Sequence, residues 1–175
     1  MIQRMIIVVF VAAVLFALPA FAADVLVPMN LVNEQGAGKS IGTVTVSESP
    51  KGLVFTPNLT DLTPGVHGFH VHQNPDCAAA MKDGKQVPAL AAGGHYDPAA
   101  VGKHEGPEGK GHLGDLPALT VGSDGKATAA VTAPRLKMAE VKGRSLMIHA
   151  GGDNYADQPA PLGGGGARVA CGVIK

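Results

Sequence analysis

Seven metal-binding side chains, spread over half of this 175-residue chain, constrain its fold more than any other feature. They are six of the seven histidines and one aspartate: His70, His72, His95, His104, His112, Asp115 and His149. Four protein ligands usually close a structural zinc site, whereas a catalytic metal takes fewer and keeps an open position. Seven ligands in one small domain therefore predict two metal ions close together, with room for a shared ligand.

The ligand types narrow the choice of metal. Imidazoles suit copper and zinc, and one added carboxylate remains suitable for zinc. Neither of the two cysteines is among the seven candidate ligands, so an iron–sulfur cluster or a thiolate zinc site is not indicated. The alternative is that each histidine is an ordinary buried polar residue. Six histidines and an aspartate on one loop and two strand ends argue against that alternative.

The N-terminus has the pattern of an export signal. Arg4 precedes an apolar run over residues 6–18, and Ala20-Phe21-Ala22 matches the small-x-small rule of signal-peptide cleavage. The apolar run is too short to span a bilayer comfortably, and polar residues follow it, which argues against a membrane anchor. We therefore expect residues 1–22 to be a cleaved signal peptide and residues 23–175 to be one mature domain without a stable membrane anchor.

Charge and cysteine content add two expectations. The 14 basic and 14 acidic residues balance, so there is no electrostatic reason to expect nucleic acid as a partner. Two cysteines in an exported protein usually form one disulfide, here between Cys77 and Cys171. The alternative is two free thiols.

Hydrophobic patterning predicts an all-β domain. Runs with β-branched residues, bounded by Gly, Pro, Asn or Asp, indicate strands at 25–32, 41–47, 52–57, 66–73, 118–121, 127–132, 145–150 and 167–174. Ser123-Asp124-Gly125 is typical of a hairpin turn between two of them. One short helix within 134–142 is as plausible as none. About eight short strands with Gly-rich turns favour a sandwich or barrel.

Two long loops interrupt the strands. Residues 74–117 hold four of the seven candidate ligands and no convincing long strand, so we expect metal to order this loop. Residues 151–166 form a second, Gly-rich loop. A nucleotide-binding role for that loop is weakly supported, because it lacks the G-x-G-x-x-G spacing and the strand–loop–helix setting.

Five stretches of the chain form a recognisable set. They are Gly68-Phe69-His70-Val71-His72, Gly93-Gly94-His95-Tyr96-Asp97-Pro98, Gly111-His112-Leu113-Gly114-Asp115-Leu116-Pro117, 149–155, and 163–173 with Arg168 and Cys171. Together, in this order, they resemble copper/zinc superoxide dismutases of the bacterial exported, periplasmic type. The resemblance covers essentially all of the expected mature chain and implies an eight-stranded Greek-key barrel or flattened sandwich with long metal-binding and Gly-rich loops.

The resemblance also implies a role for each side chain. His95 would bridge the two metals, with catalysis resting on His95 and Arg168. Copper would bind His70, His72, His95 and His149, and zinc would bind His95, His104, His112 and Asp115. Asp153 would accept hydrogen bonds from His70 and His104. Arg168 would attract the superoxide anion, assisted by a field to which Lys82, Lys85, Lys103 and Lys110 are candidate contributors. We expect His67, the seventh histidine, to be structural.

The activity implied by the resemblance is disproportionation of superoxide to dioxygen and hydrogen peroxide in the periplasm. Copper would be the redox metal, and zinc would hold and tune His95. The competing hypothesis is an exported copper/zinc buffer protein without turnover. Arg168 and the bridging position of His95 favour the enzyme, because a buffer needs neither. The sequence leaves monomer and homodimer equally open.

Overall fold

The computed structural model describes residues 23–175, so the expected signal peptide lies outside the described residues. Within the described part, no helix is long and apolar enough to cross a membrane. One antiparallel sheet of seven strands dominates the molecule, in the spatial order β5-β10-β11-β1-β2-β3-β9. Its strands are β1 (Val25–Asn33), β2 (Gly36–Ser49), β3 (Gly52–Leu59), β5 (Phe69–His72), β9 (Val131–Ala133), β10 (Arg144–His149) and β11 (Arg168–Ile174).

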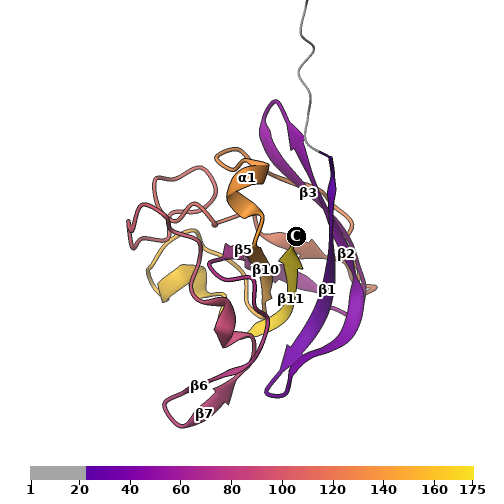
Figure 1. The fold of residues 1–175 in the computed structure, drawn as a ribbon, viewed down its shortest axis with the longest axis vertical. Helices are drawn as coiled ribbons and strands as arrows, with labels where there is room; N and C mark the ends of the chain where they lie inside the picture. The colour runs from indigo at the N-terminus through magenta and orange to yellow at the C-terminus, as the bar shows by residue number, and fades with distance from the viewer. Residues whose placement is uncertain (1–22) are drawn as a thin grey trace, which may run out of the picture.

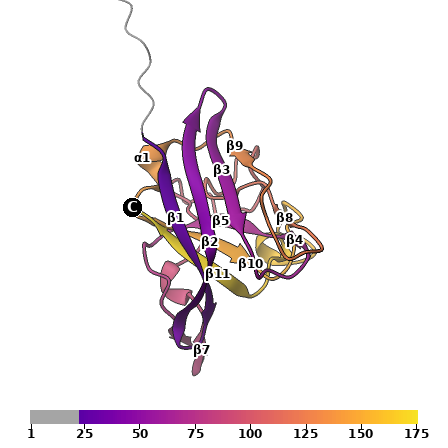
Figure 2. The same cartoon turned by 90° about the vertical axis from the view of Figure 1, so that its right-hand side faces the viewer.

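The sheet curls on itself so that the long β1–β3 ribbon lies across from β5 and β10 (Figures 1 and 2). Two small antiparallel pairs complete the strands: β4 (Gly65–His67) with β8 (Leu119–Val121), and β6 (Ala80–Lys82) with β7 (Lys85–Val87). The β6–β7 hairpin projects from the body of the molecule (Figure 1). The remaining elements are the helix α1 (Met138–Val141) and the 3-10 helices η1 (Leu90–Ala92) and η2 (Pro161–Gly164).

Alternating burial along the strands builds the core. In β3, Leu53, Phe55 and Leu59 are fully buried, because every second side chain of a strand points to the same face. The rings of Phe55 and Phe69 meet edge to face with centroids 5.9 Å apart, which joins β3 to β5 across the interior. All four residues of β5 are buried: Phe69 and Val71 belong to the apolar core, while the two histidines between and after them face the loops.

The eight predicted strands all exist in outline, with three differences. The predicted strand 66–73 is divided at Gly68, whose N–H bonds to the Gly151 carbonyl at 2.8 Å instead of continuing a ladder. The strand β2 begins earlier than predicted, and the strand predicted at 127–132 begins only at Val131. The short helix within 134–142 is present as α1.

The turn at Ser123-Asp124-Gly125 forms, but the hairpin expected around it does not. The Gly122 N–H donates to the Lys126 carbonyl at 2.8 Å and closes the turn. The strands on either side then separate, since β8 pairs with β4 and β9 pairs with β3. That part of the prediction was wrong because pairing with distant strands outweighed the local turn.

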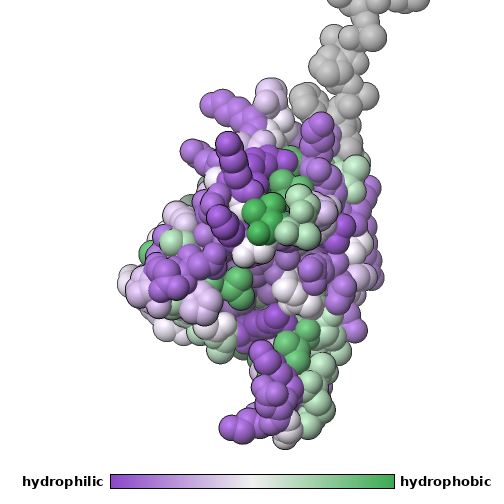
Figure 3. Space-filling view, turned by 90° about the vertical axis from the view of Figure 1, so that its left-hand side faces the viewer, coloured by the Kyte–Doolittle hydropathy of each residue, from purple (hydrophilic) through white to green (hydrophobic). Residues whose placement is uncertain are grey.

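The Cys77–Cys171 disulfide is present, with Cα atoms 5.8 Å apart, and the described residues contain no free cysteine. It ties the long loop to β11 beside a small apolar cluster that includes Ala89, Ala92 and Met147. The loop 74–117 is also more regular than expected, because it contains the strands β6 and β7 and the 3-10 helix η1. Figure 3, which views the side where the loops lie, shows a mainly hydrophilic face with apolar residues in small separate groups.

Candidate metal centre

The strand β5 positions the first two histidines and pairs with the loop that carries His95, His104, His112 and Asp115. His70 and His72 share one face because they are two residues apart. The free edge of β5 then pairs with the loop, forming isolated bridges between His70 and Asp115 and between His72 and His95. The Val71 backbone accepts from the Tyr96 N–H at 2.8 Å. Backbone pairing thus brings ligands that are 23 and 45 residues apart next to one another.

The last histidine arrives from the neighbouring strand. His149 ends β10, which pairs with β5 on one side and with β11 on the other. The His149 N–H donates to the Gly68 carbonyl at 2.9 Å, so the end of β10 is fixed at the break before β5. Across the other ladder, His149 is the register partner of Arg168.

Four histidines form the first group: His70, His72, His95 and His149, all buried, each with a ring nitrogen within 4.8 Å of those of the others. The Nε2 atoms of His72 and His149 face each other at 3.3 Å. Their Nδ1 atoms donate to the carbonyls of Gly93 at 2.9 Å and Gly166 at 3.1 Å, which leaves Nε2 as the free atom of each ring.

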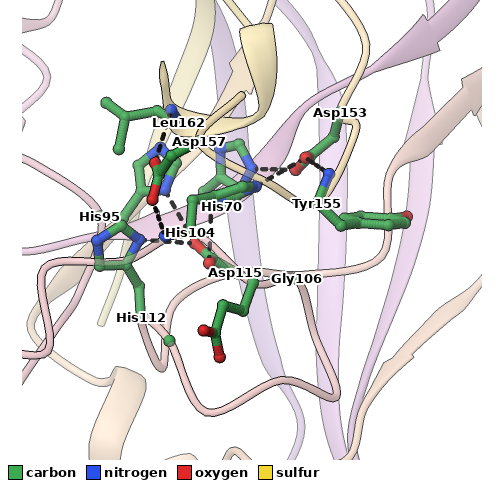
Figure 4. A network of polar contacts seen from close by, with 12 residues as sticks. His70, His95, His104, Gly106, His112, Asp115, Asp153, Tyr155, Asp157 and Leu162 are labelled. Atoms are coloured by element: carbon green, nitrogen blue, oxygen red, sulfur yellow. Dashed lines mark hydrogen bonds and ion pairs between the residues drawn. The ribbon is translucent and has the colours of Figure 1, made fainter. Parts of the chain in front are cut away.

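A second group lies beside the first and consists of His70, His95, His104 and Asp115, again within 4.8 Å. The Asp115 carboxylate lies between two of these rings, with Oδ1 2.9 Å from His95 Nδ1 and Oδ2 2.9 Å from His104 Nδ1 (Figure 4). His112 stands at the edge of this group: its Nδ1 is 3.4 Å from Asp115 Oδ1. His95 belongs to both groups, as does His70.

Asp153, from the Gly-rich loop, connects the two groups (Figure 4). One carboxylate oxygen lies 2.7 Å from His70 Nε2 and the other 2.7 Å from His104 Nε2, and all three side chains are fully buried. Gly163 permits this approach, because a Cβ atom there would lie 2.1 Å from Asp153 Oδ1 and 2.7 Å from His104 Nε2. Asp153 therefore leaves Nδ1 as the free atom of both histidine rings.

The unpartnered polar atoms show that the two groups fit cations. Buried polar atoms without a hydrogen bond are costly and uncommon in native proteins. Two such atoms, His70 Nδ1 and His112 Nδ1, lie here, and His104 Nδ1 and Asp115 Oδ2 have only each other as a partner, 2.9 Å apart. Each would be satisfied by a metal ion, and imidazole with at most one carboxylate is a donor set that suits copper and zinc.

Electrostatics differ between the two groups. Burial and the nearby His95 lower the pKa of His70 to about 3, and burial lowers the pKa of His149 to about 4. In the second group, burial opposes protonation of His104, but hydrogen bonds to Asp115 and Asp153 outweigh it and raise the His104 pKa to about 9. Although burial opposes their ionisation, the two carboxyl groups keep pKa values well below the usual range through hydrogen bonds from histidines. The second group is thus the more negative.

Arg168 lies beside the first group without joining it. Its guanidinium donates to the carbonyls of Ala89 at 2.5 Å and Gly93 at 2.6 Å. The Gly93 carbonyl also accepts from His72, so one backbone oxygen holds both the arginine and a histidine of the first group. The side chain is half-buried, and burial lowers its pKa, yet a guanidinium stays charged in proteins. A fixed positive charge therefore stands next to the four histidines.

Other residues contribute only support. His67 bonds to the carbonyls of Thr63 at 2.8 Å and His149 at 2.7 Å and takes part in neither group, in line with a structural role. Asp157 was not singled out from the sequence, although it accepts from the His104 N–H at 3.0 Å and the Leu162 N–H at 3.3 Å (Figure 4). No sequence signal could have found it, because its partners are backbone atoms of two separate loops.

The fold and the two joined groups define an antiparallel β-barrel protein with a histidine-rich centre for two metal ions. The family model described as copper/zinc superoxide dismutase (SODC) matches residues 40–174. Curated Cu-Zn superoxide dismutases of Brucella abortus and Escherichia coli K12 are each 61% identical to this chain. The matches span 163 and 166 residues, or 93% and 94% of this chain and 94% and 96% of those proteins.

Solved structures give the same result. The chain is similar to the Cu/Zn superoxide dismutase from Brucella abortus, with a TM-score of 0.86 and 60% identity. It is also similar to the solution structure of the monomeric copper, zinc superoxide dismutase from Salmonella enterica, with a TM-score of 0.79 and 64% identity. Each comparison covers 87% of this chain and 100% of the other. The chain belongs to the copper/zinc superoxide dismutase family.

Proposed function

We propose that this protein disproportionates superoxide to dioxygen and hydrogen peroxide at a copper–zinc centre of the cell envelope. Membership of the superoxide dismutase family supports the activity and the two metals. The observation that carries the assignment to these residues is the position of His95, which belongs to both ligand groups and has its Nδ1 on the side of Asp115. His70 also belongs to both groups, but Asp153 engages its Nε2, so only one nitrogen of that ring is available. A buffer protein would have no use for a ring shared between two metals.

The free ring atoms support a ligand set for each metal. Copper would be held by Nδ1 of His70 and by Nε2 of His72, His95 and His149; the second partners of His70, His72 and His149 leave these atoms available. Zinc would be held by Nδ1 of His95, His104 and His112 and by the Asp115 carboxylate. Asp153 orients the copper ligand His70 and the zinc ligand His104 together, since it accepts from both rings.

When bound, copper supplies one-electron redox chemistry and zinc supplies a fixed charge without redox chemistry. The protein's own residues then bind the substrate and handle protons. Arg168 presents a permanent positive charge beside the copper ligands and attracts the superoxide anion. His95 can carry a proton at Nε2 while its Nδ1 stays engaged on the zinc side, so it is suited to deliver a proton to the peroxide product.

Export would explain both the N-terminal apolar segment and the disulfide. We assign residues 1–22 to a signal peptide and residues 23–175 to the mature enzyme, located in the periplasm. The Cys77–Cys171 bond supports this, because disulfides form and persist in oxidising compartments such as the periplasm. Mass spectrometry of the protein recovered from a periplasmic extract checks both points: a mature chain that still contains Arg4 would contradict the assignment.

The deciding experiment measures metals and turnover on one sample. Purified mature protein is analysed for copper and zinc and assayed for superoxide consumption. The enzyme assignment predicts one copper and one zinc per chain and catalytic turnover that disappears when copper is removed. Full occupancy of both metals without superoxide consumption would instead identify a copper/zinc buffer.

A further inference from the structure

One arginine outside the ligand motifs, Arg135, is hydrogen-bonded to the part of the long loop that runs from His104 to His112, two of the proposed zinc ligands. Arg135 follows β9 and precedes Leu136, whose side chain is buried in the barrel core. The guanidinium donates to four backbone carbonyls: Gly106 at 3.2 Å, Pro107 at 2.9 Å, Gly111 at 3.2 Å and His112 at 2.5 Å. Arg135 therefore fastens both sides of the turn between His104 and His112 to the barrel.

Other hydrogen bonds of this turn hold its N–H groups, such as that of His104 to Asp157 and that of Lys110 to Glu105, whereas Arg135 holds its carbonyl groups. Residues 101–114 belong to no helix or strand of the structure, and carbonyl groups of such a segment still need hydrogen-bond partners. A guanidinium is suited to that task because it carries five N–H donors in a rigid planar fork and a permanent charge. Charge-assisted hydrogen bonds are also stronger than neutral ones. A lysine at this position could reach only part of the set.

His112 is the proposed ligand whose ring is held least. Among the residues described, its ring makes no hydrogen bond, and its buried Nδ1 lies 3.4 Å from Asp115 Oδ1. The other proposed histidine ligands each bond to a carboxylate or a backbone carbonyl. The place of His112 thus depends on its backbone, where the N–H donates to the Lys103 carbonyl at 2.9 Å and the carbonyl accepts from Arg135.

We propose that Arg135 is a positioning residue for zinc, holding the turn so that the His112 ring faces Asp115 (Figure 4). The inference rests on the proposed zinc ligand set. All four hydrogen bonds that the Arg135 guanidinium donates among the described residues go to backbone carbonyls, so Arg135 acts through the backbone. Its loss should therefore affect the zinc side while the copper ligands, which come from β5, β10 and the loop beside β5, keep their places.

The test compares Arg135→Met with Arg135→Lys and with two controls. Lys51→Met removes one positive charge from the same surface hollow, which both residues line. Val141→Ala lowers stability from a buried core position in α1. Zinc release to a chromogenic chelator is measured on the copper- and zinc-loaded proteins. We expect Arg135→Met to release zinc about 10–100-fold faster, the range for losing a residue that supports a metal ligand. Arg135→Lys should fall between, and both controls should match wild type.

Two further measurements separate positioning from general destabilisation. Cobalt(II) in the zinc site reports ligand geometry through its visible absorption, which should change in Arg135→Met and stay unchanged in Val141→Ala. In the metal-free proteins, hydrogen exchange at the His112 amide should accelerate in both Arg135 variants and not in Lys51→Met. Unchanged zinc release and cobalt absorption in Arg135→Met, with only a lower melting temperature, would overturn the inference.

A ligand variant distinguishes this inference from the assignment on which it rests. If His112→Ala loses zinc and the Arg135 variants do not, the role of Arg135 is wrong and the ligand set stands. If His112→Ala itself keeps zinc affinity and the cobalt spectrum, the ligand assignment has failed. Should Arg135→Met not fold, Arg135→Lys decides, because it keeps the charge and most of the stem: zinc release as slow as wild type would then overturn the proposal.

Discussion

Removal of the disulfide should destabilise the protein strongly and loosen the wall of the active site. The bond joins residues 94 positions apart. In the chain-entropy model, a closed loop of that length restricts the unfolded state by about 4.7 kcal/mol, and native disulfides of small secreted domains contribute about 2–5 kcal/mol. The double variant Cys77→Ala/Cys171→Ala leaves no free thiol and puts no hydroxyl at the buried Cys171 position.

The structure also predicts a loss of activity. Cys77 packs with Ala89 and Ala92, and the segment that contains them supplies the carbonyls of Ala89 and Gly93 to Arg168. If that segment loosens, Arg168 loses its fixed position, so turnover should fall at equal copper content. Urea unfolding of the metal-free proteins measures the stability, because bound metals would prevent two-state analysis. A loss below about 1 kcal/mol, with unchanged turnover, would refute this reasoning.

Three further predictions concern the metals and the substrate. Asp115→Ala should lower zinc affinity by more than the roughly 10–100-fold that loss of a supporting residue costs, and should lower the melting temperature; equal zinc content and melting temperature would remove Asp115 from the ligand set. Arg168→Ala should leave both metals in place and raise the activation free energy by about 1.5–3 kcal/mol, which slows turnover roughly 10–150-fold, with partial recovery in Arg168→Lys. Turnover equal to wild type at matched copper would exclude a role of Arg168 in attracting the substrate. Zinc binding to the metal-free protein at pH 7.5 should release about one proton from His104, whose pKa of about 9 keeps it protonated until zinc displaces the proton. Calorimetry in buffers of different ionisation enthalpy measures this release, which should diminish above pH 9; no release at pH 7.5 would contradict the protonated state.

The sequence alone determined much of the architecture, because strand period and ligand chemistry are local properties. The spacing of His70 and His72 places both rings on one face of any strand, whatever that strand pairs with. The imidazole-rich ligand set indicated copper and zinc, and two cysteines in an exported chain indicated one bond. Division of the ligands between the two metals came from resemblance to a family, since spacing along the chain does not distinguish His104 from His149.

The tertiary structure decided everything that depends on backbone atoms meeting across the fold. The free edge of β5 pairs with the loop and so places Asp115 and His95 beside His70 and His72. Carbonyl oxygens of Gly93 and Gly166 select the free nitrogen of two rings, although no side-chain pattern marks them.

Contacts between distant parts of the chain also decided two features that local sequence patterns predicted wrongly or did not predict. The turn at residues 123–125 formed without its hairpin, because the flanking strands gained more from pairing with β3 and β4. No sequence pattern singled out Arg135, because only the fold brings four loop carbonyls to its guanidinium. The sequence gives the type of each residue. The distant backbone group that accepts a given hydrogen bond is determined only by the packing of the whole chain, because buried polar atoms must then have partners.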